Sequence, residues 1–391
     1  MRVTAILLAT PYYPPNLGGV QQYVWNLARQ LRKRHDWRVV VVTTAEPGVA
    51  YRREVDADGV TVHRLPSLRR ISNTPVGTGW TGAIRRIIRD EKIDLVNAHG
   101  PVPLFADLAR RAAGDVPFVL TYHAGRMRKG SLAPDLVLAT YEGMLLASTV
   151  RRSQELICAS EHVGDDLPKL FSGRQTVIEP GADLDLFRRT PVPPEQRIVF
   201  SASLEKATAY KGLADLLHAV ARLAPSLPDV HLEVAGSGTA EQDYHELARR
   251  LGISERVTFA GYLSGERLAE AYRRARVLCL PTHFDNYPTV IVEAMATGRP
   301  IVATRVGAIP MFVSEGGSGL LNEPGDIDAL TGSLRTVLTD YDLAARLGAT
   351  GADFVAANLS WQHQSDRHVA VFQRAMAGGR TVSRTEASRQ G

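Results

Sequence analysis

The chain has 391 residues and a formal net charge of +5, from 46 Lys and Arg against 41 Asp and Glu. This length predicts two or three domains, and 45% hydrophobic with 22% charged residues excludes a disordered chain. Two cysteines are too few for a disulfide framework or a multi-cysteine zinc site. No apolar run reaches the roughly 18 residues that a membrane span needs, so we expect a cytoplasmic protein.

The charge is unevenly distributed along the chain. Residues 1–190 carry 26 basic and 19 acidic side chains, a balance of +7, whereas residues 191–391 carry 20 and 22, a balance of −2. A basic half suits an anionic ligand, a phosphate-rich surface or nucleic acid. For most of these arginines, solvated positions on helix faces are the better interpretation.

Short apolar runs alternate with amphipathic segments through the first half, which is typical of a parallel sheet with helices on both faces. The predicted strands there are residues 3–9, 38–44, 60–65, 93–98, 118–121 and 156–159. The pattern restarts with predicted strands 198–202, 230–235, 257–259, 277–280 and 301–303, and with helices 326–338, 343–355 and 361–376. We therefore predict two doubly wound α/β domains.

Three prolines in residues 187–194 predict a flexible linker between these domains, with boundaries at 1–190 and 191–359. The Arg-, Ser- and Thr-rich residues 378–391 predict a disordered tail. Ligands of such sheets lie beyond the carboxyl ends of the strands, so we expect a shared cleft between the two domains.

The loop after the first strand contains Gly18-Gly19 just before a helix. Glycines let the backbone approach a ligand closely, and the helix N-terminus offers N–H groups to an anion. A plain tight turn is an equally good interpretation. The third glycine of a dinucleotide fingerprint is missing, both here and after Gly236-Ser237-Gly238.

Two carboxylates, Asp285 and Glu293, are eight residues apart, the first in a loop after a strand and the second on the following helix. Glu293 lies within an otherwise apolar stretch, and a carboxylate on a buried helix face is costly unless it is paired or binds a ligand. A paired acid of the core is the alternative. Its place beside a loop at the strand ends favours sugar hydroxyls as partners.

Three further side chains stand at strand ends. Lys206 and Lys211 follow the predicted strand 198–202 and would suit phosphate oxygens, although solvated surface lysines are an equal alternative. His123 follows the predicted strand 118–121, where a cleft histidine is a candidate for catalysis, although a lone histidine is more often structural.

Together these segments resemble the retaining glycosyltransferases of family 4, which have the GT-B fold of two facing Rossmann-like domains. The resemblance extends from the first strand to about Phe372. It is densest in Val257-Thr258-Phe259-Ala260-Gly261, Glu293-Ala294-Met295-Ala296-Thr297-Gly298-Arg299-Pro300, Ile301-Val302-Ala303-Thr304 and Gly319-Leu320-Leu321.

The resemblance implies transfer of a sugar from a nucleotide diphosphate sugar to a hydroxyl with retained anomeric configuration. In its terms Asp285 contacts the donor sugar, although the family usually has glutamate there, and Glu293 holds the ribose. Lys211 matches the family lysine at the diphosphate, whereas Ser203 stands where the family has arginine. We assign catalysis to His123, Lys211, Asp285 and Glu293. The expected donor-binding residues are Gly18, Gly19, Ser203, Lys206, Lys211, Leu263, Asp285, Asn286, Tyr287, Pro288, Thr289, Val290 and Glu293.

For the acceptor side, carried by the first domain, we expect Tyr13, Asn16, Gln21, His99, His123 and Arg126. No metal and no cofactor is expected, because lysines and amides would neutralise the diphosphate of a donor that is preferably a UDP- or GDP-sugar. The helix at 360–376 is expected to pack back on the first domain, and closure about residues 191–194 to exclude water.

The expected setting is a bacterial cell-envelope glycan or secondary-metabolite pathway. The partners would be the donor and a small-molecule or glycan acceptor, without nucleic acid, in a monomer or homodimer. Peripheral contact with the inner face of the membrane stays open, because residues 136–146 are apolar enough for a partly exposed helix. Alternatives are an epimerase or inverting transferase of the same fold, a non-catalytic nucleotide-binding protein and a dinucleotide-dependent oxidoreductase.

Overall fold

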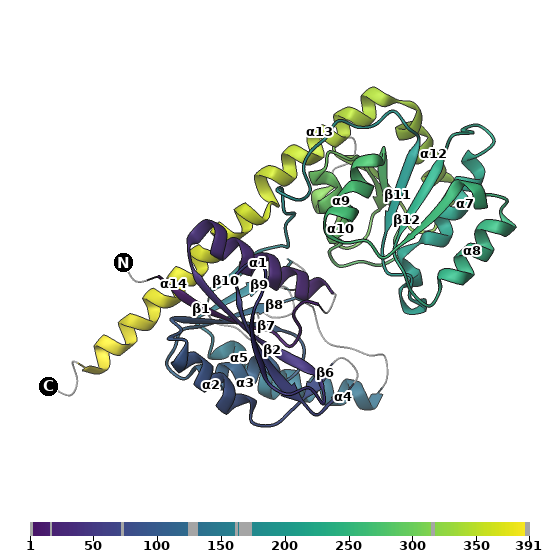
Figure 1. The fold of residues 1–391 in the computed structure, drawn as a ribbon. Coiled ribbons are helices and arrows are strands. Elements are labelled where there is room, and N and C mark those ends of the chain that lie inside the picture. Colours follow the sequence, from purple (N-terminus) through teal and green to yellow (C-terminus); the bar gives the residue numbers. More distant parts are fainter. Residues whose placement is uncertain are drawn as a thin grey trace. The chain divides into compact units, whose positions relative to one another are not determined.

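A computed structural model describes residues 3–15, 18–71, 74–123, 132–160, 163, 174–313 and 317–387. The chain forms two compact units (Figure 1). Unit 1 comprises Met1–Pro180 and Trp361–Gly391, and unit 2 comprises Gly181–Ser360. The chain therefore passes from one unit to the other at 180–181 and again at 360–361.

Unit 1 is built on an eight-stranded sheet with the strand order β10-β9-β8-β7-β1-β2-β4-β3. All neighbours pair in parallel except β3 and β4, which are antiparallel. The strands are β1 (Ala5–Ala9), β2 (Arg38–Pro47), β3 (Arg52–Val55), β4 (Thr61–Ser67), β7 (Leu95–Gly100), β8 (Phe118–Tyr122), β9 (Glu155–Cys158) and β10 (Arg174–Val177). A separate antiparallel pair is formed by β5 (Arg69–Ile71) and β6 (Thr74–Val76).

The central strands of unit 1 are buried along their whole length, so their side chains contribute to separate cores on the two faces of the sheet. The helices are α1 (Gly19–His35), α2 (Trp80–Asp90), α3 (Phe105–Ala113), α4 (Leu132–Tyr141), the π-helix η1 (Glu142–Leu146), α5 (Ala147–Arg151) and α14 (Trp361–Ala387). In Figure 1, α14 runs beside α1, and the two helices are in contact. Trp361 and Phe372 bury α14 in the same core as Val24 and Leu27 of α1.

Unit 2 has a six-stranded parallel sheet in the order β13-β12-β11-β14-β15-β16. Its strands are β11 (Arg197–Ser201), β12 (His231–Ala235), β13 (Val257–Gly261), β14 (Val277–Leu280), β15 (Ile301–Thr304) and β16 (Gly319–Asn322). Its helices are η2 (Lys206–Lys211), α7 (Leu213–Leu223), α8 (Glu241–Arg250), η3 (Ser254–Arg256), α9 (Gly265–Arg274), α10 (Thr289–Ala296), α11 (Ile309–Phe312), α12 (Ile327–Thr339) and α13 (Tyr341–Asn358). Two doubly wound parallel sheets are the fold class that the alternating pattern predicts.

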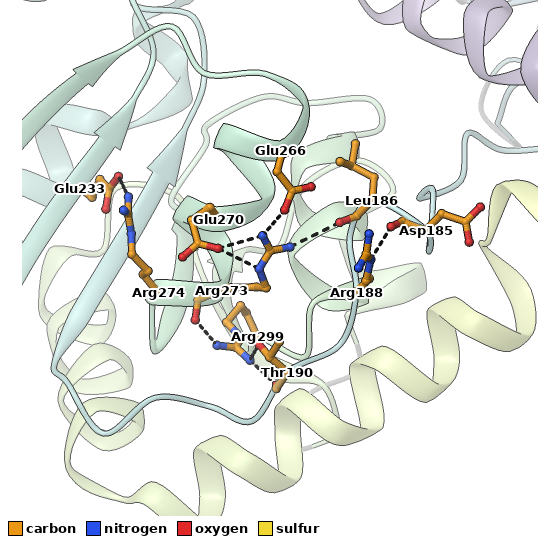
Figure 2. A network of polar contacts seen from close by, with 10 residues as sticks. All are labelled: Asp185, Leu186, Arg188, Thr190, Glu233, Glu266, Glu270, Arg273, Arg274 and Arg299. Carbon is orange, nitrogen blue, oxygen red and sulfur yellow. Dashed lines mark hydrogen bonds and ion pairs between the residues drawn. The ribbon is translucent and has the colours of Figure 1, made fainter. Parts of the chain in front are cut away.

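The predicted proline linker at 187–194 is wrong, because this stretch is packed onto unit 2. Phe187 and Val192 are buried in the core of that unit. The guanidinium of Arg299 donates to the carbonyl oxygens of Thr190 and Pro191, and Figure 2 shows it reaching Thr190. Because proline carbonyls still accept hydrogen bonds, buried arginine can fix a proline-rich segment, and the boundary lies at Pro180 rather than at residue 190.

The network in Figure 2 continues through Arg273, whose side chain bonds Glu266 and Glu270 of its own helix and the backbone of Leu186. The carbonyl oxygen of Arg273 in turn accepts from Arg299 at 2.8 Å. The segment that enters unit 2 is therefore bound to α9 and to the residues after α10, and it does not offer the hinge that the three prolines suggested.

The prediction of a disordered tail from residue 378 is also wrong over most of its length. Helix α14 continues to Ala387, and residues 388–391 lie outside the described part of the chain. Gly378 and Gly379 lower helix propensity, but the alanines and arginines around them favour a helix that is already nucleated on unit 1.

Candidate functional site

The strand order of unit 2 brings together two loops that are about 80 residues apart in sequence. Strands β11 and β14 are neighbours, and the chain winds outward from them in opposite directions, so the loops after them meet at the carboxyl edge of the sheet. Such a topological switch point is the usual ligand position in an open parallel sheet. The first loop carries Lys211 and the second carries Asp285.

Lys211 and Asp285 form an ion pair, with 2.5 Å between Nζ and Oδ2. The side chain of Asp285 is 10% exposed and that of Lys211 is 22% exposed. A carboxylate this far buried needs a cation or several donors beside it. Because an ammonium group has three N–H bonds and one is directed at Asp285, Lys211 can still donate to the oxygens of an anion.

Glycines allow the backbones of these loops to approach each other. A Cβ on Gly212, which has a φ of 82°, would lie 2.0 Å from the carbonyl oxygen of Pro281. A Cβ on Gly307 would lie 1.7 Å from the carbonyl oxygen of Asp285. Side chains at these two positions would push Lys211 and Asp285 apart, so the pair depends on both glycines.

Glu293 lies on α10, the helix that follows the Asp285 loop. Its Oε2 accepts a hydrogen bond of 3.4 Å from the hydroxyl of Tyr272, which a further hydrogen bond links to Ser201. Burial raises the pKa of Glu293 to about 8, and the bond from Tyr272 offsets this rise only in part. Among the described residues this carboxyl group therefore has one weak donor, and further donors such as sugar hydroxyls would stabilise its charged form.

Most of the other predicted donor residues lie in the Asp285 loop or at the start of α10. Pro288 precedes α10, which has no side-chain cap, so the N–H groups of Thr289 and Val290 lie at an uncapped helix start. In the loop before this helix, Asn286 is exposed and the ring of Tyr287 packs on Phe312. Leu263 is buried in the loop before α9. These residues surround the Asp285 loop or lie on the same unit.

Ser203 and Lys206 are exposed in the loop after β11. The Ser203 carbonyl accepts from Thr208 at 2.8 Å, and Lys206 lies 3.8 Å from Asp243 of α8 with both side chains about two-thirds exposed. Lys211 is thus the lysine that the structure brings to Asp285. Lys206 is directed toward another carboxylate.

Unit 1 has a switch point of its own, because β1 lies between β7 and β2. At the carboxyl ends of β7 and β8, His99 and His123 are hydrogen bonded, with 3.0 Å from Nδ1 of His99 to Nε2 of His123. Their rings are stacked, with 5.3 Å between centroids. The side chain of His99 is 1% exposed, so it cannot make its predicted contact with an acceptor in this conformation. His123 is half-buried.

The remaining predicted residues of unit 1 have different environments. Gly18 and Gly19 are exposed at the start of α1, and no atom lies within 4 Å of a Cβ built on Gly19, so that backbone is open to a ligand. Gln21 is half-buried on the first turn of α1. Tyr13 is buried and its hydroxyl donates to Asp56 at 3.2 Å, so an acceptor contact would compete with this bond. Asn16 and Arg126 lie outside the described residues.

Sequence reasoning missed the groups that hold these side chains. Tyr272 faces Glu293 from α9, and Tyr23 and His368 surround His123 from α1 and α14. Each stands at a helical position that reads as ordinary core, and its partner lies between 21 and 345 residues away. The signal that could have found Tyr272 is the raised cost of burying Glu293 without a nearby donor.

Within the described residues, no set of three or more His, Cys, Asp or Glu side chains is arranged to hold a metal ion. Over the same residues, no helix has both the length and the apolar character to cross a membrane.

The comparisons with known proteins agree with this architecture. Residues 17–186 match the model of "Glycosyltransferase Family 4", and residues 185–354 match that of "Glycosyl transferases group 1". The chain is 32% identical to D-inositol 3-phosphate glycosyltransferase of Mycolicibacterium smegmatis, over 95% of this chain and 90% of that protein. It is 27% identical to glycogen synthase of Mycobacterium tuberculosis, over 96% of both.

Solved structures share the fold along nearly the whole chain. Sucrose-phosphate synthase from Thermosynechococcus elongatus superposes with a TM-score of 0.76 at 20% identity, over 96% of this chain and all of that one. HepE of Anabaena in complex with UDP-glucose gives a TM-score of 0.70 at 18% identity, over 95% of this chain and all of that one.

Proposed function

The chain belongs to glycosyltransferase family 4, and from that premise we propose that it transfers a hexosyl group from a nucleotide diphosphate sugar to a hydroxyl acceptor, with retention of the anomeric configuration. The observation that carries the proposal is the group of Lys211, Asp285 and Glu293 at the switch point between β11 and β14. The cation of Lys211 suits a diphosphate, and the paired carboxylate of Asp285 suits a sugar. The carboxyl group of Glu293, which has few donors, suits a ribose.

Each part of the donor would have a partner in unit 2. The ribose hydroxyls would donate to Glu293, which accepts one hydrogen bond of 3.4 Å from Tyr272 and whose pKa is raised to about 8 by burial. The diphosphate would accept from Lys211 and from the amides of Thr289 and Val290 at the uncapped start of α10. Asp285, aligned by Lys211, would accept from a hydroxyl of the donor sugar.

The chemistry of the step follows from the leaving group. The glycosidic bond to the diphosphate breaks and negative charge develops on its oxygens, which Lys211 and the helix N-terminus stabilise most as the charge grows. The acceptor hydroxyl attacks from the face that the diphosphate leaves, and the departing phosphate takes the hydroxyl proton. No metal ion and no covalent intermediate on Asp285 is needed in this scheme.

UDP- and GDP-sugars are the proposed donors, and a bacterial envelope glycan or a secondary metabolite is the proposed acceptor class. Solved structures of the same fold that bind UDP and UDP-glucose support a nucleotide sugar as the donor. The curated relatives act on acceptors as different as an inositol phosphate and a glycogen chain, so their names do not select one.

The test is a panel of UDP-, GDP-, ADP- and dTDP-sugars screened for thermal stabilisation of the protein and for slow hydrolysis. Since a ligand that binds the folded state raises its stability in proportion to log concentration, the true donor should shift the melting temperature at millimolar concentration. Glu293→Gln should weaken binding of that donor by about 10- to 100-fold, as expected for hydrogen bonds to a charged group.

Glu246→Gln, an exposed acid on α8, is the matched control and should bind like the wild type. If no sugar nucleotide stabilises the protein, the proposed activity fails. Equal donor affinity in both variants would instead mean that the donor binds elsewhere. The anomeric configuration of the transfer product, read by nuclear magnetic resonance (NMR), separates retention from inversion.

A further inference from the structure

The two histidines at the carboxyl edge of the unit 1 sheet are joined nitrogen to nitrogen. Nδ1 of His99 and Nε2 of His123 are 3.0 Å apart, and the stacked rings deviate by 18° from parallel. A hydrogen bond between two neutral imidazoles needs a proton on one nitrogen and a lone pair on the other, so the contact links the tautomers of the two rings.

Both rings are neutral at physiological pH. Burial lowers the pKa of His123 to about 3 and places that of His99 well below its ordinary value. The titratable groups packed around them are Tyr23 from α1 and His368 from α14, and neither brings a negative charge that would favour an imidazolium. Each ring therefore has a single N–H.

Two tautomeric arrangements satisfy the contact, and they differ in what happens at Nε2 of His99. That atom is buried and has no hydrogen-bond partner among the described residues. If His123 donated, His99 would carry its proton on Nε2 as a buried donor without an acceptor. If His99 donates from Nδ1, its Nε2 is only a bare lone pair, and orphaned acceptors are tolerated better than orphaned donors.

In a neighbouring histidine, His368, the hydrogen-bond partners likewise determine which ring nitrogen carries the proton. Nδ1 of His368 lies 2.7 Å from the carbonyl oxygen of Gln364, which can only accept, so His368 carries its proton there. Burial lowers the pKa of His368 to about 4, hence its Nε2 is an acceptor for the Tyr23 hydroxyl at 2.8 Å. Tyr23 meets His123 through ring contact, at 4.6 Å and 80°. Among the described residues, His99 is hydrogen bonded to His123, and this bond sets the tautomer of His123.

We propose that His99 is a positioning residue, which donates from Nδ1 to His123 and thereby holds the proton of His123 on Nδ1. His123 then meets the reacting sugar as a neutral hydrogen-bond donor rather than as a general base. This inference rests on the proposed glycosyl transfer and on the assignment of His123 to catalysis. It reassigns His99 from an acceptor contact to the ring that orients His123.

The direct test is ¹⁵N NMR of the full-length protein labelled at histidine, without any substrate. The His123 signals, identified by their loss in His123→Gln, are expected to show a protonated Nδ1 and an unprotonated Nε2. A proton on Nε2 of His123 would overturn the proposal. Because this readout needs no turnover, it decides the tautomer even if the proposed activity fails.

Two variants then separate positioning from packing. His99→Phe keeps a buried ring but has no N–H, and it should lower kcat by about tenfold, the loss of one neutral hydrogen bond, with little change in KM for the donor. His99→Asn places an amide N–H close to the position of Nδ1 and should recover most of that loss. His123 should lose its single tautomer in the Phe variant and regain it in the Asn variant.

His63→Phe is the matched control, a histidine of the same sheet that is 3% exposed and bonded to Tyr51. It should leave kcat and the His123 signals as in the wild type. Equal losses of kcat in His99→Phe and His99→Asn, with unchanged His123 signals in both, would assign His99 to packing alone and overturn the proposal. Circular dichroism of each variant confirms that the compared proteins are folded.

Discussion

The two units bury ionisable groups at the carboxyl edges of their sheets in opposite ways. In unit 1, His99, His123 and His368 are kept neutral. His99 and His123 are hydrogen bonded to each other, and His368 is bonded to a tyrosine hydroxyl and to a backbone carbonyl. In unit 2, Asp285 is held by the cation of Lys211, while Glu293 has one bond of 3.4 Å from a tyrosine. The hydrogen bonds described for these histidines all go to groups of unit 1 itself, although Nε2 of His99 has no partner among the described residues. Asp285 and Glu293 of unit 2 instead offer carboxylate oxygens that a ligand could use.

This difference agrees with the direction of the pKa shifts. Burial lowers the pKa of the histidines, so acid destabilises unit 1 through them, and it raises the pKa of Glu293, so base destabilises unit 2 through it. A site that must bind a charged ligand is expected to be incomplete without it, and its stability is then lower than the fold would allow.

The largest effect on turnover is expected from removing Lys211, the cation that is paired with Asp285 in unit 2. Lys211→Ala should lower kcat by about 10²- to 10³-fold, the range for losing one donor to a developing negative charge. It should also cost unit 2 about 2–3 kcal/mol, because Asp285 is left buried without its partner. Steady-state kinetics and urea unfolding measure the two effects.

Lys206→Ala is the matched control, since both side chains of its ion pair with Asp243 are about two-thirds exposed. Such surface pairs contribute little, so this variant should change stability by no more than about 0.5 kcal/mol. Similar small effects on kcat in both variants would show that the diphosphate is held elsewhere.

The next effect, that of Glu293→Gln in the ligand-free protein, is on the pH dependence of stability and not on turnover. The folded pKa of about 8 lies above the ordinary value of 4.5, so between these pH values the unfolded chain releases a proton that the folded chain keeps. The wild type should therefore lose roughly 3–5 kcal/mol from this group as the pH rises from 4.5 to 8, and the glutamine variant should not.

Thiol labelling measures this loss in unit 2 alone, because Cys279 is buried there and Cys158 is buried in unit 1. Protection of Cys279, normalised to the unfolded rate at each pH, should fall with rising pH in the wild type and stay nearly level in the variant. Protection of Cys158 should be alike in both. A parallel fall of Cys279 protection in wild type and variant would contradict a raised pKa of Glu293 in the folded unit.

The smallest effect is expected from His368→Phe in unit 1. The folded pKa of about 4 lies below the ordinary 6.5, so as the pH falls between these values the unfolded chain gains a proton first and unit 1 loses stability. Removing this histidine should reduce the acid slope by about 1.4 kcal/mol per pH unit. The cost at neutral pH should be small, because the Tyr23 hydroxyl still reaches the Ile178 carbonyl at 3.1 Å.

Tryptophan fluorescence follows this unit selectively, because all four tryptophans, Trp25, Trp37, Trp80 and Trp361, belong to unit 1. Urea unfolding at several pH values from 4.5 to 7 would show the reduced slope. If wild type and variant kept the same slope, His368 would not be buried in a neutral form.

Much of the fold could be predicted because its strands are continuous apolar runs. The predicted strand 277–280 coincides with β14, and 118–121 falls one residue short of β8. By contrast β3, with Arg52 and Arg53 at an exposed edge, and the short β16 were missed as strands. Strand β3 is largely exposed and carries no apolar run, while β16 is mostly buried but only four residues long, so the pairing of both is visible only in the folded sheet.

The residues of the candidate site could be chosen from the sequence, but most of their contacts could not. Asp285 and Glu293 were singled out by their spacing and by the apolar stretch around Glu293, and Lys211 by its place after a strand. The sequence does not show which of the two lysines meets Asp285, or that Tyr272 meets Glu293. These contacts form only after β11 and β14 have paired. The misplaced linker has the same origin, because three prolines predict flexibility, whereas Arg299 and Arg276, both far away in sequence, anchor their carbonyl groups.

The sequence by itself determined that this chain forms two doubly wound α/β units and belongs to a family of sugar transferases, because hydrophobic period and local motifs act over short stretches of chain. The tertiary structure alone decided where unit 2 begins, which lysine is paired with Asp285, and how His99 bonds His123. These depend on contacts between residues 24 to more than 100 positions apart, whose charges and protons take their final arrangement only when burial removes water from between them.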